Sequence, residues 1–228
     1  MLSAIALTPS APVLVPALAG AATREVAQFG DAALAAAREL PDRWIAVGVG
    51  GSDGVFGPAT RGSFGGYGAD VEVTLSRDAP GTVTALPLCA LITGWLRGLA
   101  NPAAQAEVRV YSADYEPGAA FDLGRRLRAE IDRVGEPVGV LVVADGATTL
   151  TAAAPGGHDP AAPAMQDALD DALAAGDVAA LASVSSVAVG RVAYQVAAGL
   201  VEPGPRSATE LARGAPYGVG YFVGVWSP

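Results

Sequence analysis

Lysine is absent from this chain of 228 residues, and all 14 of its Lys or Arg side chains are arginine. Without lysine the chain cannot form a Schiff base with a carbonyl substrate, and it lacks the phosphate-binding lysine of a P-loop. Cysteine and histidine are equally scarce, with one copy each, Cys89 and His158. A single cysteine excludes an internal disulfide and a cysteine-rich zinc site. Because Cys89 falls in an apolar helical pattern with no base nearby, we expect a buried, unreactive thiol.

Positive charge is also in short supply, since 23 acidic residues give a net charge of −9. Nucleic-acid binding is therefore not expected, because phosphate contacts need clustered cations. The densest group of arginines lies within Asp122–Asp132, interleaved with acids as on a solvated helix face. Apolar runs stay below the roughly 20 residues that span a bilayer. The first cation is Arg24, so the apolar start lacks the basic region of a signal peptide, and we expect a cytoplasmic protein.

What the chain does have is apolar residues, which make up 51% of it, against 16% charged. This balance is typical of a compact globule. Aromatic residues are only 6%, so alanine, valine and leucine must fill the core. With no internal repeat and no long linker, residues 1–228 are predicted to form a single domain.

Apolar segments of strand length alternate with longer segments of helical periodicity along most of the chain. Strands are predicted at 3–7, 44–49, 71–75, 107–111, 138–144 and 219–225. Helices are predicted at 17–40, 86–99, 119–134, 164–174, 178–183 and 187–200. The glycine-rich stretch from 50 to 68 and the segment 152–163 are predicted to be loops. Such alternation indicates an α/β fold with a central, mainly parallel (mixed) sheet and helices on both faces.

Two motifs follow the second predicted strand. Residues 50–54 fit G-x-S-x-G around Ser52, and with Asp145 and His158 further along they give the Ser, Asp, His order of an α/β-hydrolase. However, a nucleophile elbow leads into a helix, whereas 55–68 contains five glycines and a proline. The glycines at 48, 50 and 51 also resemble a dinucleotide fingerprint, but position 53 is Asp where the last glycine belongs. A tight turn explains both patterns better.

A non-haem iron site is a third possibility that the sequence argues against. A facial triad needs two histidines and a carboxylate, and His158 is the only histidine. A symmetric oligomer could pair two copies of His158, but its glycine and proline neighbours indicate an exposed turn.

Three segments of the chain resemble one family. The longest of them, residues 144–181, reads ADGATTLTAAAPGGHDPAAPAMQDALDDALAAGDVAAL. It is similar to a segment that runs from S-G-x-L-S-H through A-P-G-G-Y-D-P to F-D and A-L-x-A-G-D. That segment is found in the class III extradiol ring-cleavage dioxygenase family, among the proteins that are similar to the beta chain of protocatechuate 4,5-dioxygenase. Residues 8–20, TPSAPVLVPALAG, resemble the family's opening P-H-P-P-L-L-V-P-E-L-A-G, and residues 215–226 resemble its closing strand. The resemblance covers the whole chain and looks closest to an uncharacterised actinobacterial branch.

The resemblance implies an extradiol dioxygenase-like fold, but the residues that hold Fe(II) in the family do not carry over. Ser10 stands where the first metal histidine belongs, and Ser52 and Asp53 stand in the loop of the second. Leu150 replaces the acid/base histidine, and Asp145 replaces the serine of S-G-x-L-S-H. The last ligand falls near 187–189, which reads Val-Ala-Val, and His158 falls where the family commonly has tyrosine. No metal and no cofactor are therefore expected, and the chain is predicted to be a pseudoenzyme.

A cleft at the carboxyl ends of the strands is expected to survive without the iron. Its predicted residues are Ser10, Ser52, Asp53, Asp114, Asp145 and Tyr217. Asp53 and Asp145 both follow strands and could approach each other, to run acid–base chemistry or bind a divalent cation, or each could simply brace a loop. The first hypothesis is a binding or scaffolding protein whose partner is an unknown small molecule or protein, with no nucleic-acid or membrane partner. The alternatives are a hydrolase-like enzyme in the same cleft and a dioxygenase with an unusual metal site.

Overall fold

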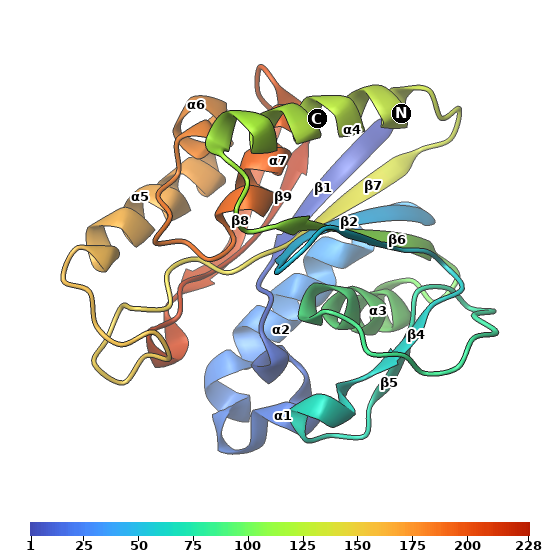
Figure 1. The fold of residues 1–228 in the computed structure, drawn as a ribbon, viewed down its shortest axis with the longest axis horizontal. Coiled ribbons are helices and arrows are strands. Elements are labelled where there is room, and N and C mark those ends of the chain that lie inside the picture. Colours follow the sequence, from blue (N-terminus) through green and yellow to red (C-terminus); the bar gives the residue numbers. More distant parts are fainter.

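A seven-stranded mixed sheet forms the centre of the computed structural model, which describes residues 1–228 (Figure 1). Its strands are β1 (Leu2–Thr8), β2 (Arg43–Gly50), β3 (Gly54–Phe56), β6 (Gln105–Ser112), β7 (Val138–Val143), β8 (Ser207–Gly214) and β9 (Tyr221–Ser227). The order across the sheet is β3-β6-β2-β7-β1-β9-β8. The four inner strands β6, β2, β7 and β1 are parallel, whereas β3, β9 and β8 each pair antiparallel with a neighbour. The predicted α/β class with a mainly parallel central sheet is confirmed.

Helices cover both faces of this sheet. They are α1 (Pro16–Ala19), α2 (Thr23–Arg38), α3 (Leu88–Ala100), α4 (Pro117–Asp132), α5 (Ala162–Ala175), α6 (Val178–Ala182) and α7 (Arg191–Val201). In Figure 1, α2 and α3 lie below the sheet, and α4 to α7 lie above it. Each layer has its own apolar core of 28 buried residues, one on each side of the sheet. None of the helices combines the length and the apolar character needed to cross a membrane.

Strand β7 shows how the sequence builds both cores at once. All six of its residues are buried, and they are apolar or glycine without interruption. Val138, Val140 and Val142 point into the core beneath α4 and α7, while Leu141 and Val143 point into the core beside α2 and α3. This alternation follows from the two-residue period of a strand, and a strand covered on both faces must be apolar at every position.

Small residues allow α4 and α7 to pack backbone to backbone. A Cβ atom built on Gly124 would lie 2.1 Å from the carbonyl oxygen of Val196, and one on Gly199 would lie 2.0 Å from that of Phe121. Any side chain at either position would push the helices apart. The glycines therefore explain how a chain with few aromatic residues still closes its core.

Several predicted elements differ from the structure. The helix predicted at 17–40 is broken at Gly20, whose φ of +52° is incompatible with a continuous helix. The loop predicted at 50–68 contains β3 and also β4 (Arg61–Ser63). Strand β4 pairs with β5 (Glu72–Thr74) in a separate two-stranded sheet, so the predicted strand at 71–75 is not part of the main sheet. Helix α7 begins at Arg191 rather than 187, and β8 has no counterpart in the prediction.

Candidate functional site

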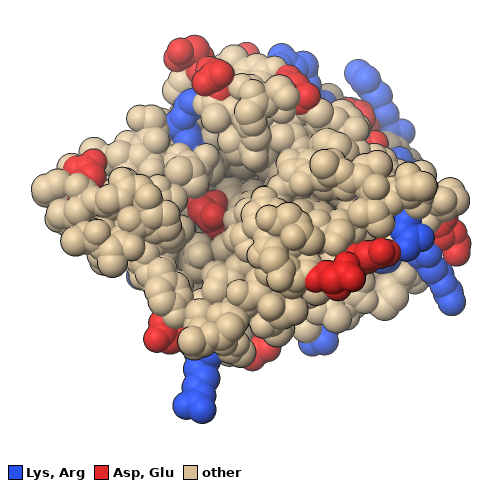
Figure 2. Space-filling model, turned by 60° about the horizontal axis from the view of Figure 1, so that its bottom comes forward, with Lys and Arg blue, Asp and Glu red and all other residues tan.

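Two of the six predicted cleft residues meet at the carboxyl ends of β1 and β7. Thr8 is paired with Val143 in the sheet, so the segments that follow both strands leave it side by side. The backbone N–H of Ser10 donates to Oδ1 of Asp145 at 2.8 Å. Strand β1 runs towards the bottom of the molecule in Figure 1, and Figure 2 turns that side to the front. The surface there is hollowed, and an acidic side chain lies in the hollow. Strand ends of this kind are where α/β proteins bind ligands.

The carboxyl group of Asp145 has unusual chemistry for an aspartate. Burial raises its pKa to about 7, and the hydrogen bond from Ser10 only partly offsets that shift. No second carboxylate contributes to the shift. Oδ2 accepts no hydrogen bond from the protein, and the side chain remains partly open to solvent. Asp145 therefore changes charge near neutral pH with one oxygen available to a ligand.

Thr8 at the end of β1 and Tyr221 at the start of β9 are polar residues near the same strand ends as this carboxyl. Thr8 is 1% exposed, and its hydroxyl has no hydrogen-bond partner. Tyr221, at the start of the neighbouring strand β9, is close enough for the charge of Asp145 to raise its pKa further, beyond the effect of burial. Tyr194 is satisfied, since its hydroxyl donates to the Ala144 carbonyl at 2.9 Å. An unpartnered buried hydroxyl costs free energy and calls for a functional or structural explanation.

Asp53 lies at the ends of β2 and β6, where it braces a loop. Its Oδ1 accepts the N–H of Ser112 at 2.8 Å, and its Oδ2 accepts the hydroxyl of Tyr115 at 2.7 Å. Both oxygens are therefore used inside the protein. Ser52 and Asp114 line the same shallow, open hollow of about 420 Å³. The structure thus gives Asp53 and Asp145 different partners, and they share no hydrogen bond.

The segment around Ser52 does not form a nucleophile elbow. The chain passes from β2 through a short bend directly into β3, so the motif connects a strand to a strand. An elbow needs a helix after the serine to hold its hydroxyl up at the sheet end. His158 is exposed, and its one bridge is to Leu150 in the loop before α5. It is not among the residues that line the hollow around Ser52.

Tyr217, the last predicted cleft residue, lies in an exposed turn before β9. Its side chain is 47% exposed, and its backbone is in the left-handed region with φ of +56°. The nearby carboxylate of Glu25 in α2 raises its pKa. The tyrosine therefore interacts with the rim of the α2 layer rather than with Asp145.

The residues at the strand ends do not fit a non-haem iron. Iron of this type needs imidazole and carboxylate ligands arranged around one point. The resemblance assigns the ligands to Ser10, to the loop of Ser52 and Asp53, and to the apolar residues 187–189. No three histidine, cysteine, aspartate or glutamate side chains in the structure come together as a metal site. Asp145 is the only carboxylate that lies against Ser10.

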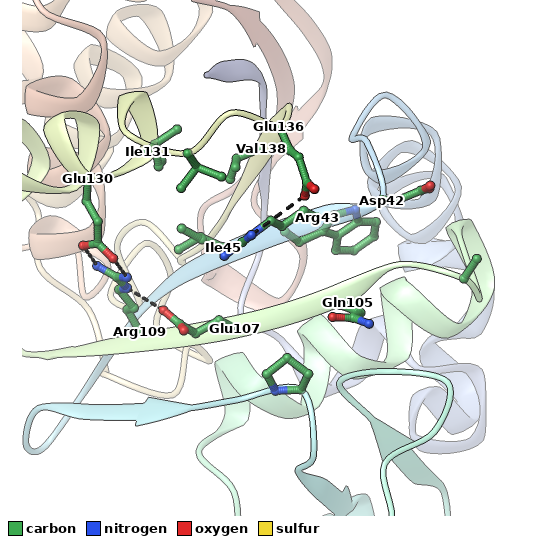
Figure 3. A pocket seen from close by; sticks show the side chains of 14 residues that line it. Asp42, Arg43, Ile45, Gln105, Glu107, Arg109, Glu130, Ile131, Glu136 and Val138 are labelled. Carbon is green, nitrogen blue, oxygen red and sulfur yellow. Dashed lines mark hydrogen bonds and ion pairs between the residues drawn. The ribbon is translucent and has the colours of Figure 1, made fainter.

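A second hollow, of about 400 Å³, opens at the opposite end of the strands, where β2, β6 and β7 begin (Figure 3). Both of its arginines, and three of its four acidic side chains, are in ion pairs. Arg109 pairs with Glu107 at 2.9 Å and with both oxygens of Glu130, and Arg43 lies 3.9 Å from Glu136. The Glu130 carboxylate raises the pKa of Arg109, and Arg109 lowers the pKa of Glu130. Because these charges satisfy each other, we assign the hollow a structural role.

Cys89 is buried in α3 as predicted, and burial raises the pKa of its thiol to about 11. A thiol with that pKa is protonated at neutral pH and is a poor nucleophile.

Thr8 and Tyr221 are residues near the candidate site that the sequence analysis did not single out. A lone threonine at the end of an apolar strand was the available signal for Thr8, whereas the position of Tyr221 depends on how β9 pairs with β1.

Comparison with known proteins gives the fold alone. No protein-family model matches the chain, and no curated protein matches its sequence. Among solved structures, the uncharacterized protein JW3007 from Escherichia coli K12 superposes on 99% of this chain and 100% of its own, with a TM-score of 0.59 and 11% sequence identity. At that identity the similarity indicates a shared architecture and carries no information about activity.

Proposed function

We propose that this protein is a small-molecule binding protein with an extradiol dioxygenase-like fold that works without iron. Asp145 is the residue that contacts the ligand. The observation that carries the proposal is its carboxyl group, which has one oxygen held by Ser10, the other unpartnered, and a pKa of about 7. The ligand donates a hydrogen bond to Oδ2 from an N–H or O–H group.

The surroundings of Asp145 support a polar ligand rather than an apolar one. The hydroxyl of Thr8 is buried without a partner at the end of β1, and the charge of Asp145 acts on the buried phenol of Tyr221. A polar ligand that donates to the free oxygen of Asp145 would give this carboxyl its second partner, and a few such polar contacts are how small-molecule sites obtain specificity.

The proposal is tested by a screen of small polar metabolites with ligand-observed NMR at pH 7.5. Ligands of this site should bind the wild-type protein and lose most of their affinity for Asp145→Asn, in which the acceptor facing the ligand can become an amide donor. Asp70→Asn is the matched control, because Asp70 is exposed and makes no ion pair or hydrogen bond in the structure. Ligands that bind Asp145→Asn and the wild type equally would place the site elsewhere.

A second candidate function is acid–base catalysis in the same cleft. It is favoured by the pKa of Asp145, because a group that titrates near pH 7 can both accept and donate a proton under physiological conditions. For an enzyme, Asp145→Asn would abolish turnover of a ligand found in the screen while ligand binding persists, and the rate would depend on a group with a pKa near 7. If the wild type returns the ligand unchanged after prolonged incubation, acid–base catalysis on that ligand is excluded and the binding role remains.

A further inference from the structure

A groove between α5 and β8 contains a second carboxylate that the protein leaves half satisfied. This α5–β8 groove has a volume of about 620 Å³, and the residues that matter in it are Leu150, Pro163, Gln166, Asp170, Asp171 and Arg213. It adjoins the Asp145 site, because Gln166 accepts the N–H of Ala147, two residues beyond Asp145, and because, beyond the effect of burial, the charges of Asp145 and Asp170 both raise the pKa of Tyr194. None of the predicted cleft residues lines it.

Asp170 lies at the bottom of the groove. It is 6% exposed, and its Oδ1 accepts the amide of Gln166 at 2.8 Å. Gln166 is fixed in turn, because its own oxygen accepts the N–H of Ala147 at 2.7 Å. No hydrogen bond reaches Oδ2 of Asp170. This oxygen stays open to the groove, so it can accept a hydrogen bond from a donor outside the protein.

The protein's own cation does not fill that place. Arg213 is near enough for its charge to lower the pKa of Asp170, which burial raises to about 6. Its guanidinium nevertheless bonds to Asp171 at 2.7 Å and lies 3.4 Å from Glu210, both on the rim. Asp170 therefore remains a negatively charged group at neutral pH without a counter-ion in direct contact.

The shape of the groove indicates an organic cation rather than a metal ion. Asp167 and Asp171 are exposed on α5, one turn of helix apart, and they do not converge with Asp170 on one point. A divalent cation needs several oxygen ligands around a single centre. An ammonium group needs only one strong acceptor, and the side chains of Leu150 and Pro163 offer apolar contact for an alkyl stem.

We propose that the α5–β8 groove binds a small molecule that carries a primary ammonium group on a short alkyl stem, with the ammonium donating to Asp170. Asp167 and Asp171 attract the cation from the rim, and Gln166 holds the Asp170 carboxylate in place.

The test uses n-butylammonium as the probe and 1-butanol as its neutral counterpart, titrated into the isotope-labelled protein and followed by amide chemical shifts. We expect saturable shifts in α5 and β8 with n-butylammonium, and binding of 1-butanol at least about tenfold weaker, as befits a charge-assisted hydrogen bond. Tetramethylammonium, which has the charge but no N–H donor, should also bind more weakly. Equal binding of the alcohol, or shifts confined to other parts of the chain, would overturn the proposal.

Variants provide the second arm. Asp170→Asn should weaken n-butylammonium binding at least about tenfold, whereas Asp70→Asn should leave it unchanged. Should Asp170→Asn fail to fold, Asp171→Asn decides, because Asp171 is exposed and its loss frees Arg213 to repel the probe. We expect binding to fall several-fold in that variant. Wild-type affinity in Asp170→Asn, or in Asp171→Asn, contradicts the proposed role of Asp170.

Discussion

Asp145 gives the structure a specific dependence of stability on pH. Burial raises its pKa from 3.8 to about 7 in the folded protein, while in the unfolded chain the group titrates normally. Below pH 4 the carboxyl is protonated in both states, so its burial carries no penalty. Between pH 4 and 7 only the unfolded chain loses the proton, so the folding free energy becomes less favourable as pH rises. Above pH 7 the penalty is constant.

The substitution Asp145→Asn removes this penalty. One pKa unit corresponds to about 1.36 kcal/mol, so the full shift is worth about 4 kcal/mol at pH 8. Allowing for the part of the side chain that solvent reaches, we expect Asp145→Asn to stabilise the protein by about 2 to 4 kcal/mol at pH 8. The asparagine can still accept the Ser10 N–H, because it keeps an oxygen at the same place. At pH 4 the variant and the wild type should unfold at similar denaturant concentrations.

The assay is urea unfolding followed by circular dichroism, at pH 4 and pH 8, for wild type, Asp145→Asn and the control Asp70→Asn. A gain in stability at pH 8 that disappears at pH 4 is expected for Asp145→Asn and not for the control. A variant that is less stable than wild type at pH 8, or that shows the same change at both pH values, would refute the assignment of a buried, desolvated carboxyl.

Two further substitutions test the packing. Gly124→Ala should destabilise the protein by about 3 kcal/mol, because the added methyl group meets the backbone of α7. Its control, Gly118→Ala in the open first turn of α4, should be neutral or stabilising. Thermal unfolding compares the two variants, and similar melting temperatures would contradict the close approach of α4 and α7. Arg97→Met should lower the free energy of unfolding by about 3 kcal/mol, because buried Arg97 donates hydrogen bonds to the carbonyls of Thr74, Pro102 and Ala104. Arg77→Met, on the exposed surface, is its control. A loss below about 1 kcal/mol in urea unfolding of Arg97→Met would show that these hydrogen bonds contribute little.

The sequence predicted the fold well where a single physical rule decides it. Strand β7 is an unbroken apolar run, so it had to be buried on both faces, and it is. The edge of the sheet was harder to predict. Strand β8 is mostly exposed and polar, and it forms because β9 offers it a row of hydrogen bonds, which is information that β8 does not contain. The glycine-rich segment containing β3 was missed for the same reason.

The candidate site was predictable only as a list of positions at strand ends. Asp53 and Asp145 both follow strands, as the apolar pattern implied. Their partners depend on tertiary structure: Ser112 and Tyr115, far along the chain, satisfy Asp53, and Asp145 is left with Ser10 alone. Which carboxylate stays chemically available is therefore decided by residues about 60 and 135 positions away in the sequence.

The most direct test of the central claim is elemental analysis of the protein, purified without a histidine tag and incubated anaerobically with ferrous iron before removal of unbound metal. Our account holds that the strand-end cleft cannot hold non-haem iron, so it predicts a folded protein with far less than one iron per chain. One tightly bound iron per chain would contradict it and would return ring-cleaving oxygenase chemistry to first place.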